Sequence, residues 1–119
     1  MNLPLIKQFR EPDTPFLSPA TVGNFFGLQV QDLAAAAGVH RNTPISRPHA
    51  PRLQTYLRDL LRVLVVATEL TGDSKRAAFL LRNEPLRAFG YQTADSLIQK
   101  GRADDVVAYL ESFSSGAAG

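Results

Sequence analysis

The sequence of 119 residues contains no cysteine, no tryptophan and only two histidines, His40 and His49. Without cysteine, the chain has no disulfide, no thiolate metal ligand and no thiol nucleophile. Both histidines lie in a proline-rich stretch with no carboxylate close by in the sequence, which makes a poor metal site, so we expect both in loops. No glycine-rich phosphate loop is evident either. We therefore expect no bound metal, no cofactor and no enzymatic activity.

Long hydrophobic stretches are also missing. The apolar run VLVVA at residues 63–67 is far shorter than the ~20 residues that span a bilayer. The N-terminal stretch MNLPLIKQFREPDTPFL is interrupted by proline and charged residues, unlike the apolar core of a signal peptide. With 45% apolar and 20% charged residues, the composition is that of a globular protein. We expect a cytoplasmic protein without a membrane contact.

The net charge of +2 is small, but the positive charge is concentrated in one segment. Residues 40–62 contain five arginines and a single acidic residue, Asp59, whereas the segments on either side are slightly acidic. A local basic stripe is what binding to a nucleic-acid backbone requires. A row of solvated arginines on a surface helix would leave the same pattern, so the charge alone does not distinguish the two.

Helix signals occur along most of the chain. Ser18 followed by Pro19 is typical of a helix start, and Asp73 before a later helix has the same role. At positions 51–70 apolar residues recur at helical spacing, which predicts one long helix of roughly 30 Å. Residues 1–15 contain three prolines and no helical period, so we expect an extended arm. No segment favours a β-strand, and the predicted fold class is all-α.

The stretch LAAAAGVHRN at residues 33–42 resembles the first half of a DNA-binding helix-turn-helix. Leu33, Ala34 and Gly38 offer an apolar anchor, a small residue where two helices cross, and a glycine in the turn. Arg41 and Asn42 would then begin the second helix, where such side chains can contact phosphates and base edges.

Pro44, Pro48 and Pro51 interrupt that second helix. With Pro44 in the first turn, Pro48 lacks the amide that would bond back to it, at a cost of ~3 kcal/mol in a helix interior. At most one helical turn is therefore expected. A degenerate motif kept as a structural lobe explains the sequence as well as active DNA reading does. The candidate DNA-contacting residues are Arg41, Asn42 and Arg47.

A longer pattern, GDSKRAAFLLRNEPLRAFGYQTADSLIQKGRADDVVAYLESF, occupies residues 72–113. It combines a Gly-Asp pair before a helix, a bulky pair, an N-x-x-L loop, a glycine, a threonine-capped helix that ends in glycine, and a valine- and leucine-bearing last helix. The positions are Gly72, Asp73, Phe79, Leu80, Asn83, Leu86, Gly90, Thr93, Leu97, Gly101, Val106, Val107 and Leu110. In order and spacing, this pattern resembles the toxin-binding domain of the Xre/MbcA/ParS-like antitoxins. The family often has tryptophan at the position of Phe79 and proline at that of Ala94.

The resemblance extends upstream, because a helix-turn-helix-like lobe and a long helix suit the same family. It implies four parts along the chain. These are an extended arm at 1–15, a degenerate helix-turn-helix lobe at 16–50, a linking helix at 51–71, and a toxin-binding domain with a flexible tail at 72–119.

The function implied by the resemblance is that of an antitoxin in a type II toxin–antitoxin system. The resemblance implies a homodimer that binds a RES-domain toxin and blocks its active-site cleft. A RES-domain toxin is an enzyme that consumes NAD⁺ or transfers ADP-ribose from it. Many such antitoxins also repress their own operon by binding operator DNA. The candidate toxin-binding residues are Arg87, Phe89, Tyr91, Phe113, Ser114, Ser115 and Gly116.

Two alternatives remain open at this stage. Aromatic and arginine side chains beside a glycine are typical of interface hot spots, yet Leu86 and Phe89 could instead close the base of their own lobe. The alternative function is a stand-alone helix-turn-helix transcriptional regulator that uses its C-terminal lobe only for dimerisation.

Overall fold

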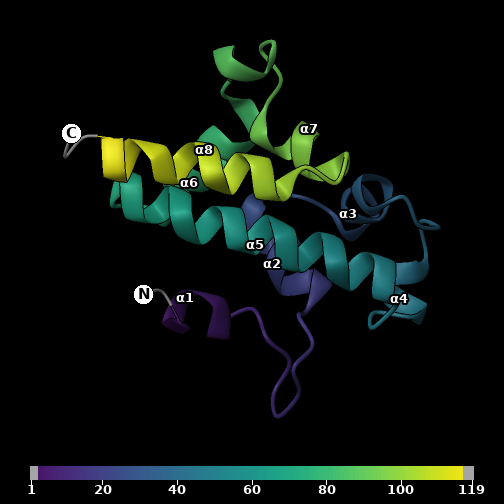
Figure 1. The fold of residues 1–119 in the computed structure, drawn as a ribbon. Coiled ribbons are helices and arrows are strands. Elements are labelled where there is room, and N and C mark those ends of the chain that lie inside the picture. Colours follow the sequence, from purple (N-terminus) through teal and green to yellow (C-terminus); the bar gives the residue numbers. More distant parts are fainter. Residues whose placement is uncertain (1–2, 117–119) are drawn as a thin grey trace. The chain divides into compact units, whose positions relative to one another are not determined.

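The computed structural model describes residues 3–116, which form helices joined by short loops, with no β-strand among them (Figure 1). The prediction of an all-α fold is confirmed. None of the described helices is long and apolar enough to cross a membrane. In chain order the helices are α1 (Leu3–Lys7), α2 (Pro19–Phe26), α3 (Val30–Ala37), α4 (Thr43–Ser46), α5 (Pro51–Thr71), α6 (Ser74–Asn83), the 3-10 helix η1 (Arg87–Phe89), α7 (Ala94–Gln99) and α8 (Ala103–Gly116).

The chain divides into two compact units, Met1–Arg58 and Asp59–Gly119, whose boundary lies within α5. The long helix is present where its apolar spacing predicted it, and it contributes to both units. Its buried residues include Leu53 and Leu57 before the boundary, and Leu60, Leu61 and Leu64 after it.

Local signals in the sequence explain the ends of the helices in the N-terminal unit. The Ser18 side chain accepts a hydrogen bond from the Thr21 amide at the start of α2. Gly27 and Gly38 end α2 and α3 with φ angles of 70° and 73°, a conformation that glycine adopts without strain. Gly23 is needed for another reason, since a Cβ there would lie 2.8 Å from the carbonyl oxygen of Leu28.

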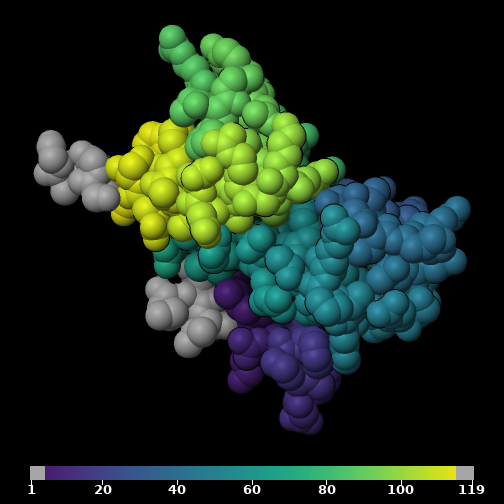
Figure 2. Space-filling view, turned by 45° about the vertical axis from the view of Figure 1, so that its right-hand side comes forward, coloured from purple at the N-terminus to yellow at the C-terminus, as the bar shows by residue number. Residues whose placement is uncertain are grey.

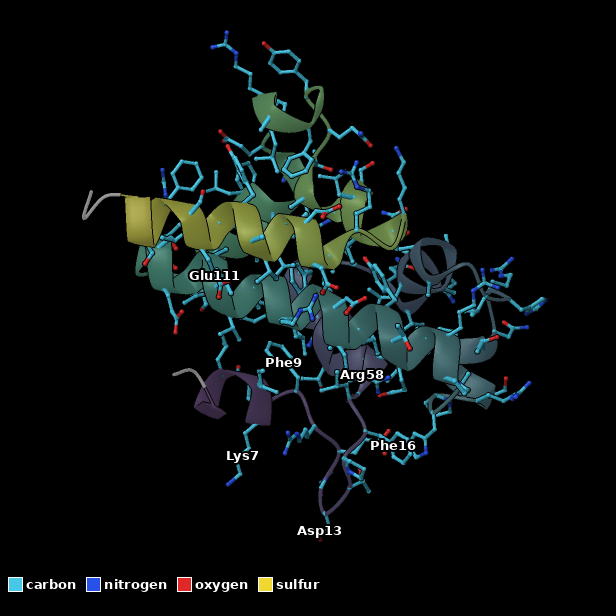
Figure 3. All side chains as sticks on the ribbon, in the orientation of Figure 1. Lys7, Phe9, Asp13, Phe16, Arg58 and Glu111 are labelled. Carbon is cyan, nitrogen blue, oxygen red and sulfur yellow. The ribbon has the colours of Figure 1, made fainter. Side chains whose placement is uncertain are left out.

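The N-terminal segment is not an extended arm, contrary to the expectation from its prolines. Residues Leu3–Lys7 form α1, and Phe9 is 1% exposed, with its ring in an edge-on contact 5.2 Å from that of Phe25. Phe9 points toward the neighbouring helices, whereas Lys7 and Asp13 point away (Figure 3). The burial of one aromatic ring therefore fixes the segment, and a helical period cannot reveal such an anchor.

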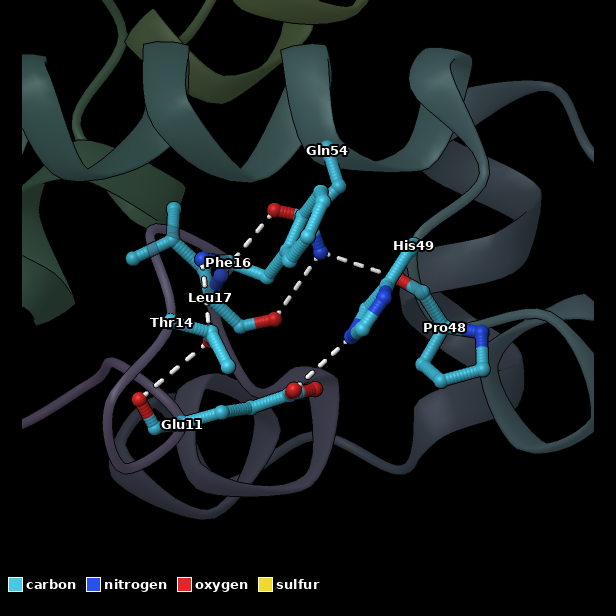
Figure 4. A network of polar contacts seen from close by, with 7 residues as sticks. All are labelled: Glu11, Thr14, Phe16, Leu17, Pro48, His49 and Gln54. Carbon is cyan, nitrogen blue, oxygen red and sulfur yellow. Dashed lines mark hydrogen bonds and ion pairs between the residues drawn. The ribbon is translucent and has the colours of Figure 1, made fainter.

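A buried glutamine connects this segment to the proline-rich loop of the same unit (Figure 4). Gln54, on α5, is 1% exposed. Its Oε1 accepts from the Leu17 amide at 3.0 Å, and its Nε2 donates to the carbonyls of Leu17 at 2.9 Å and Pro48 at 2.8 Å. Backbone groups on two loops that lie far apart in the sequence are thus satisfied by one side chain, as buried polar groups require.

His49 forms a second connection between the same loops (Figure 4). Its ring stacks on that of Phe16 at 3.8 Å, and its Nε2 lies 2.7 Å from Oε1 of Glu11. No carboxylate is near His49 in the sequence, but folding brings Glu11 to it from 38 residues away. Within residues 3–116, no three histidine or acidic side chains gather as a metal site would need.

The C-terminal unit also begins its helices where the sequence indicates. The Asp73 carboxylate accepts from the amides of Lys75 and Arg76, and the Thr93 hydroxyl accepts from the Ser96 amide. Packed between these helices are the buried apolar residues Leu81, Leu97, Ile98 and Val106. The last helix runs further than expected, because Ser114, Ser115 and Gly116, assigned to a flexible tail, belong to α8. The remaining tail, residues 117–119, lies outside the described residues.

Candidate functional site

The loop between α6 and α7 is held in a fixed shape by its own backbone. Leu86 and Gln92 pair in an isolated antiparallel bridge, and the amides of Gln92 and Tyr91 contact neighbouring carbonyls. Gly90 and Tyr91 both have positive φ angles, 65° and 68°, and this conformation is uncommon for a bulky residue. The loop projects from the unit beside α8 (Figure 2, green beside yellow).

Three aromatic rings, which we call the aromatic row, extend from this loop along α8. Phe89 and Tyr109 meet edge-on at 5.4 Å between ring centroids, and Tyr109 and Phe113 do so at 5.0 Å. At the other end, the Arg102 guanidinium lies 5.4 Å from the centroid of the Phe89 ring. Edge-on contacts of this kind stabilise an aromatic pair by roughly 0.5–1.5 kcal/mol beyond area burial, so the row is an ordered surface.

An apolar groove of about 260 Å³ adjoins the row within the C-terminal unit. Tyr109 and Phe113 belong to both features. Apart from Thr71, Glu84 and the hydroxyl of Tyr109, the side chains that form the groove are apolar. The lining residues are Val63, Ala67, Leu70, Thr71, Ala77, Leu80, Leu81, Glu84, Leu86, Ala94, Tyr109, Leu110 and Phe113.

The structure brings together some of the predicted toxin-binding residues and leaves others apart. Phe89 and Phe113 are linked through Tyr109, and Phe113 is 51% exposed. Arg87 and Tyr91 are exposed on the projecting loop, and among the described residues Tyr91 makes no ring contact. Ser114 is exposed, while Ser115 and Gly116 are described only as part of the α8 backbone.

Leu86 and Phe89 differ in what they contact. Leu86 lines the apolar groove and is half-buried. Phe89 is also half-buried, but its ring packs on Tyr109 and under Arg102, at the surface of the unit.

Sequence reasoning missed Tyr109, Arg102 and Glu84. Tyr109 precedes Phe113 by four residues on one helix, a spacing that places two side chains on the same face; that signal was available. Nothing in the sequence signals the contact of Arg102 with Phe89 or the place of Glu84 in the groove. Both follow from how the loop and α8 pack.

The predicted DNA-contacting residues surround α4 in the N-terminal unit. Arg41, Asn42 and Arg47 are exposed, and no ion pair joins either arginine to another described residue. The helix itself has only four residues, as the prolines predicted, and it leaves Ile45 66% exposed. A recognition helix of ordinary length is therefore absent from this position.

No protein-family model, no curated protein and no solved structure matches the chain. The C-terminal unit has an aromatic row beside an apolar groove, and the N-terminal unit has exposed arginines on either side of α4.

Proposed function

We propose that this protein is the antitoxin of a type II toxin–antitoxin pair, which binds a RES-domain toxin that consumes NAD⁺ or transfers ADP-ribose and occludes its active-site cleft. The sequence of residues 72–113 suggests the partner through its resemblance to the toxin-binding domain of Xre/MbcA/ParS-like antitoxins. The observation that carries the proposal is the aromatic row, because edge-on ring contacts order it and its last ring, Phe113 on α8, is exposed.

The row has the physical properties of a binding hot spot. Aromatic and arginine side chains supply most of the affinity in protein interfaces, because they bury a large area while losing few rotamers. Phe113 and Tyr91 are 51% and 65% exposed, so each has apolar area left to bury. Full burial of a phenylalanine side chain stabilises a complex by roughly 1.5–3 kcal/mol.

Purification of the tagged full-length chain from its native host, followed by mass spectrometry, tests this proposal. We expect a RES-domain enzyme in stoichiometric amount, with its NAD⁺ consumption suppressed in the complex. Since an occluded cleft excludes substrate, added NAD⁺ should compete with the chain. A preparation that contains no such enzyme, or one in which NAD⁺ consumption is unchanged, would contradict the proposal.

A second candidate function is supported by the exposed cations around α4. Arg41 and Arg47 are exposed and have no acidic partner among the described residues, and such arginines suit phosphate contacts. We propose that the N-terminal unit binds the operator DNA of its own operon and that the short α4 limits its reading of base sequence.

The double variant Arg41→Ala/Arg47→Ala tests DNA binding. Loss of two phosphate contacts should reduce affinity for promoter DNA about tenfold or more at low salt. The slope of the logarithm of the binding constant against the logarithm of the salt concentration should become less steep by about 2. The measurement is fluorescence anisotropy with a labelled promoter fragment at several salt concentrations. Arg76→Ala, an exposed arginine of the C-terminal unit, is the control. Equal binding by the double variant, or no binding by the unaltered chain at low salt, would rule this function out.

A further inference from the structure

We propose that the apolar groove of the C-terminal unit is the docking site for a basic amphipathic helix of the partner protein. The inference deepens the proposed function and rests on it only for the identity of that partner. The aromatic row forms one rim of the groove, since Tyr109 and Phe113 belong to both, so a partner held by the row would also reach the groove.

The groove has room for side chains from a partner. Its volume is about 260 Å³, whereas an apolar cavity of about 150 Å³ accommodates benzene. The lining comes from α5, α6, the loop after α6, the start of α7, and α8, and the rim residues Leu70 and Phe113 are 41% and 51% exposed. Large apolar side chains exposed at the rim of an apolar groove mark an interaction site.

The length of the groove suits a short helix. Its lining on α5 runs from Val63 to Thr71, about 12 Å at the helical rise of 1.5 Å per residue. This length matches about two turns of a partner helix, which presents apolar side chains at positions i, i+3 or i+4, and i+7. An aromatic or leucine anchor near the middle would fill the available volume.

The charge at the groove selects a basic partner. Glu84 lines the groove and is exposed. None of the described residues that line the groove is lysine, arginine or histidine. Complementary charges fix the orientation of a bound helix and exclude acidic ones.

Two synthetic peptides serve as probes in the test. Each has about 14 residues with leucine at helical spacing, and the flanking positions are lysine in one peptide and glutamate in the other. Each peptide is titrated into the ¹⁵N-labelled full chain at low salt, and amide chemical shifts report where it binds. We expect the lysine peptide to shift the amides of Leu70, Leu80 and Leu110, and the glutamate peptide to shift none. Because the whole chain carries a net charge of +2, general electrostatic attraction would favour the glutamate peptide instead.

A charge reversal separates the groove from the rest of the surface. Glu84→Lys should weaken binding of the lysine peptide about fivefold or more, by removing one attraction and adding one repulsion. Asp104→Lys makes the same change of charge on α8 outside the groove, at a side chain that is 91% exposed, and should leave the affinity unchanged. The spectrum of each free variant shows whether it is folded.

Four results would overturn the proposal. These are no binding of the lysine peptide, equal binding of both peptides, shifts confined to residues outside the groove, or no effect of Glu84→Lys. Concentration-dependent dimerisation of the chain that Glu84→Lys abolishes would assign the groove to a second copy instead. If the peptide test fails while a RES-domain toxin is still inhibited, the groove proposal is wrong and the proposed function stands.

Discussion

Replacing Gln54 by leucine is expected to lower the free energy of unfolding by about 3 kcal/mol, although the two side chains are similar in size. The variant leaves the Leu17 amide and the carbonyls of Leu17 and Pro48 without the partner that now satisfies them. Each buried polar group left unpaired costs about 1–3 kcal/mol, and partial relaxation of the loops reduces the sum. A change of this size is large beside the ~5–15 kcal/mol stability of ordinary domains.

Urea unfolding followed by circular dichroism measures this loss, and amide hydrogen exchange localises it. The Leu17 amide should lose protection in the variant, because its acceptor is gone. Gln99→Leu is the matched control: Gln99 is exposed on α7, and among the described residues its side chain donates only to Asp95, so its replacement should change stability by less than about 0.5 kcal/mol. A loss below about 1 kcal/mol for Gln54→Leu would contradict the assigned role of this side chain.

If the proposed RES-domain toxin is the partner, replacing Phe113 by alanine is expected to weaken its inhibition by about 30-fold, while the chain stays folded. The ring is 51% exposed and contacts Tyr109 at its edge, so it adds about 1 kcal/mol or less to folding. Its burial in a complex would contribute about 2 kcal/mol, which is roughly 30-fold in affinity. The measurement is the concentration of chain that halves NAD⁺ consumption by the toxin, with thermal unfolding of the free chain beside it.

Phe79→Ala is the matched control for this prediction. Phe79 is 65% exposed in the same unit but contributes to neither the aromatic row nor the groove, so its removal should leave inhibition unchanged. Deleting residues 114–119 distinguishes the contribution of the Phe113 ring from that of the tail, because Phe113 remains in the shortened chain. Weaker inhibition by the deletion would assign occlusion to the tail as well. Full inhibition by both Phe113→Ala and the deletion would show that the end of α8 does not contact the toxin.

Much of the secondary structure was predictable because its signals are local. The ends of α2, α6 and α7 depend on side chains within three residues of a helix terminus, namely Ser18, Asp73 and Thr93. The shortness of α4 depends on Pro48, which follows Pro44 by four residues and cannot supply the helical amide. Such rules act over one turn of helix, so the sequence displays both partners of each interaction at once.

The candidate site was predictable only in part. Phe89, Tyr91 and Phe113 could be predicted as interface candidates, because aromatic residues are among the few types that make strong interface contacts. The sequence could not show that Tyr109 joins two of these rings while Tyr91 stays apart, or that Glu84 lies in an apolar groove. Those facts depend on how the loop after α6 packs against α8.

The sequence by itself determined that most of this chain is helical, where α2, α5, α6 and α7 begin, and that several candidate interface residues lie in its C-terminal part. Only the tertiary structure decided that the N-terminal segment is anchored by Phe9, that Gln54 satisfies two distant loops, and that His49 pairs with Glu11. The physical reason is the separation along the sequence over which each kind of interaction acts. Helix caps, proline and apolar spacing act between residues a few positions apart, whereas burial and long-range hydrogen bonds join residues that only the folded chain brings together.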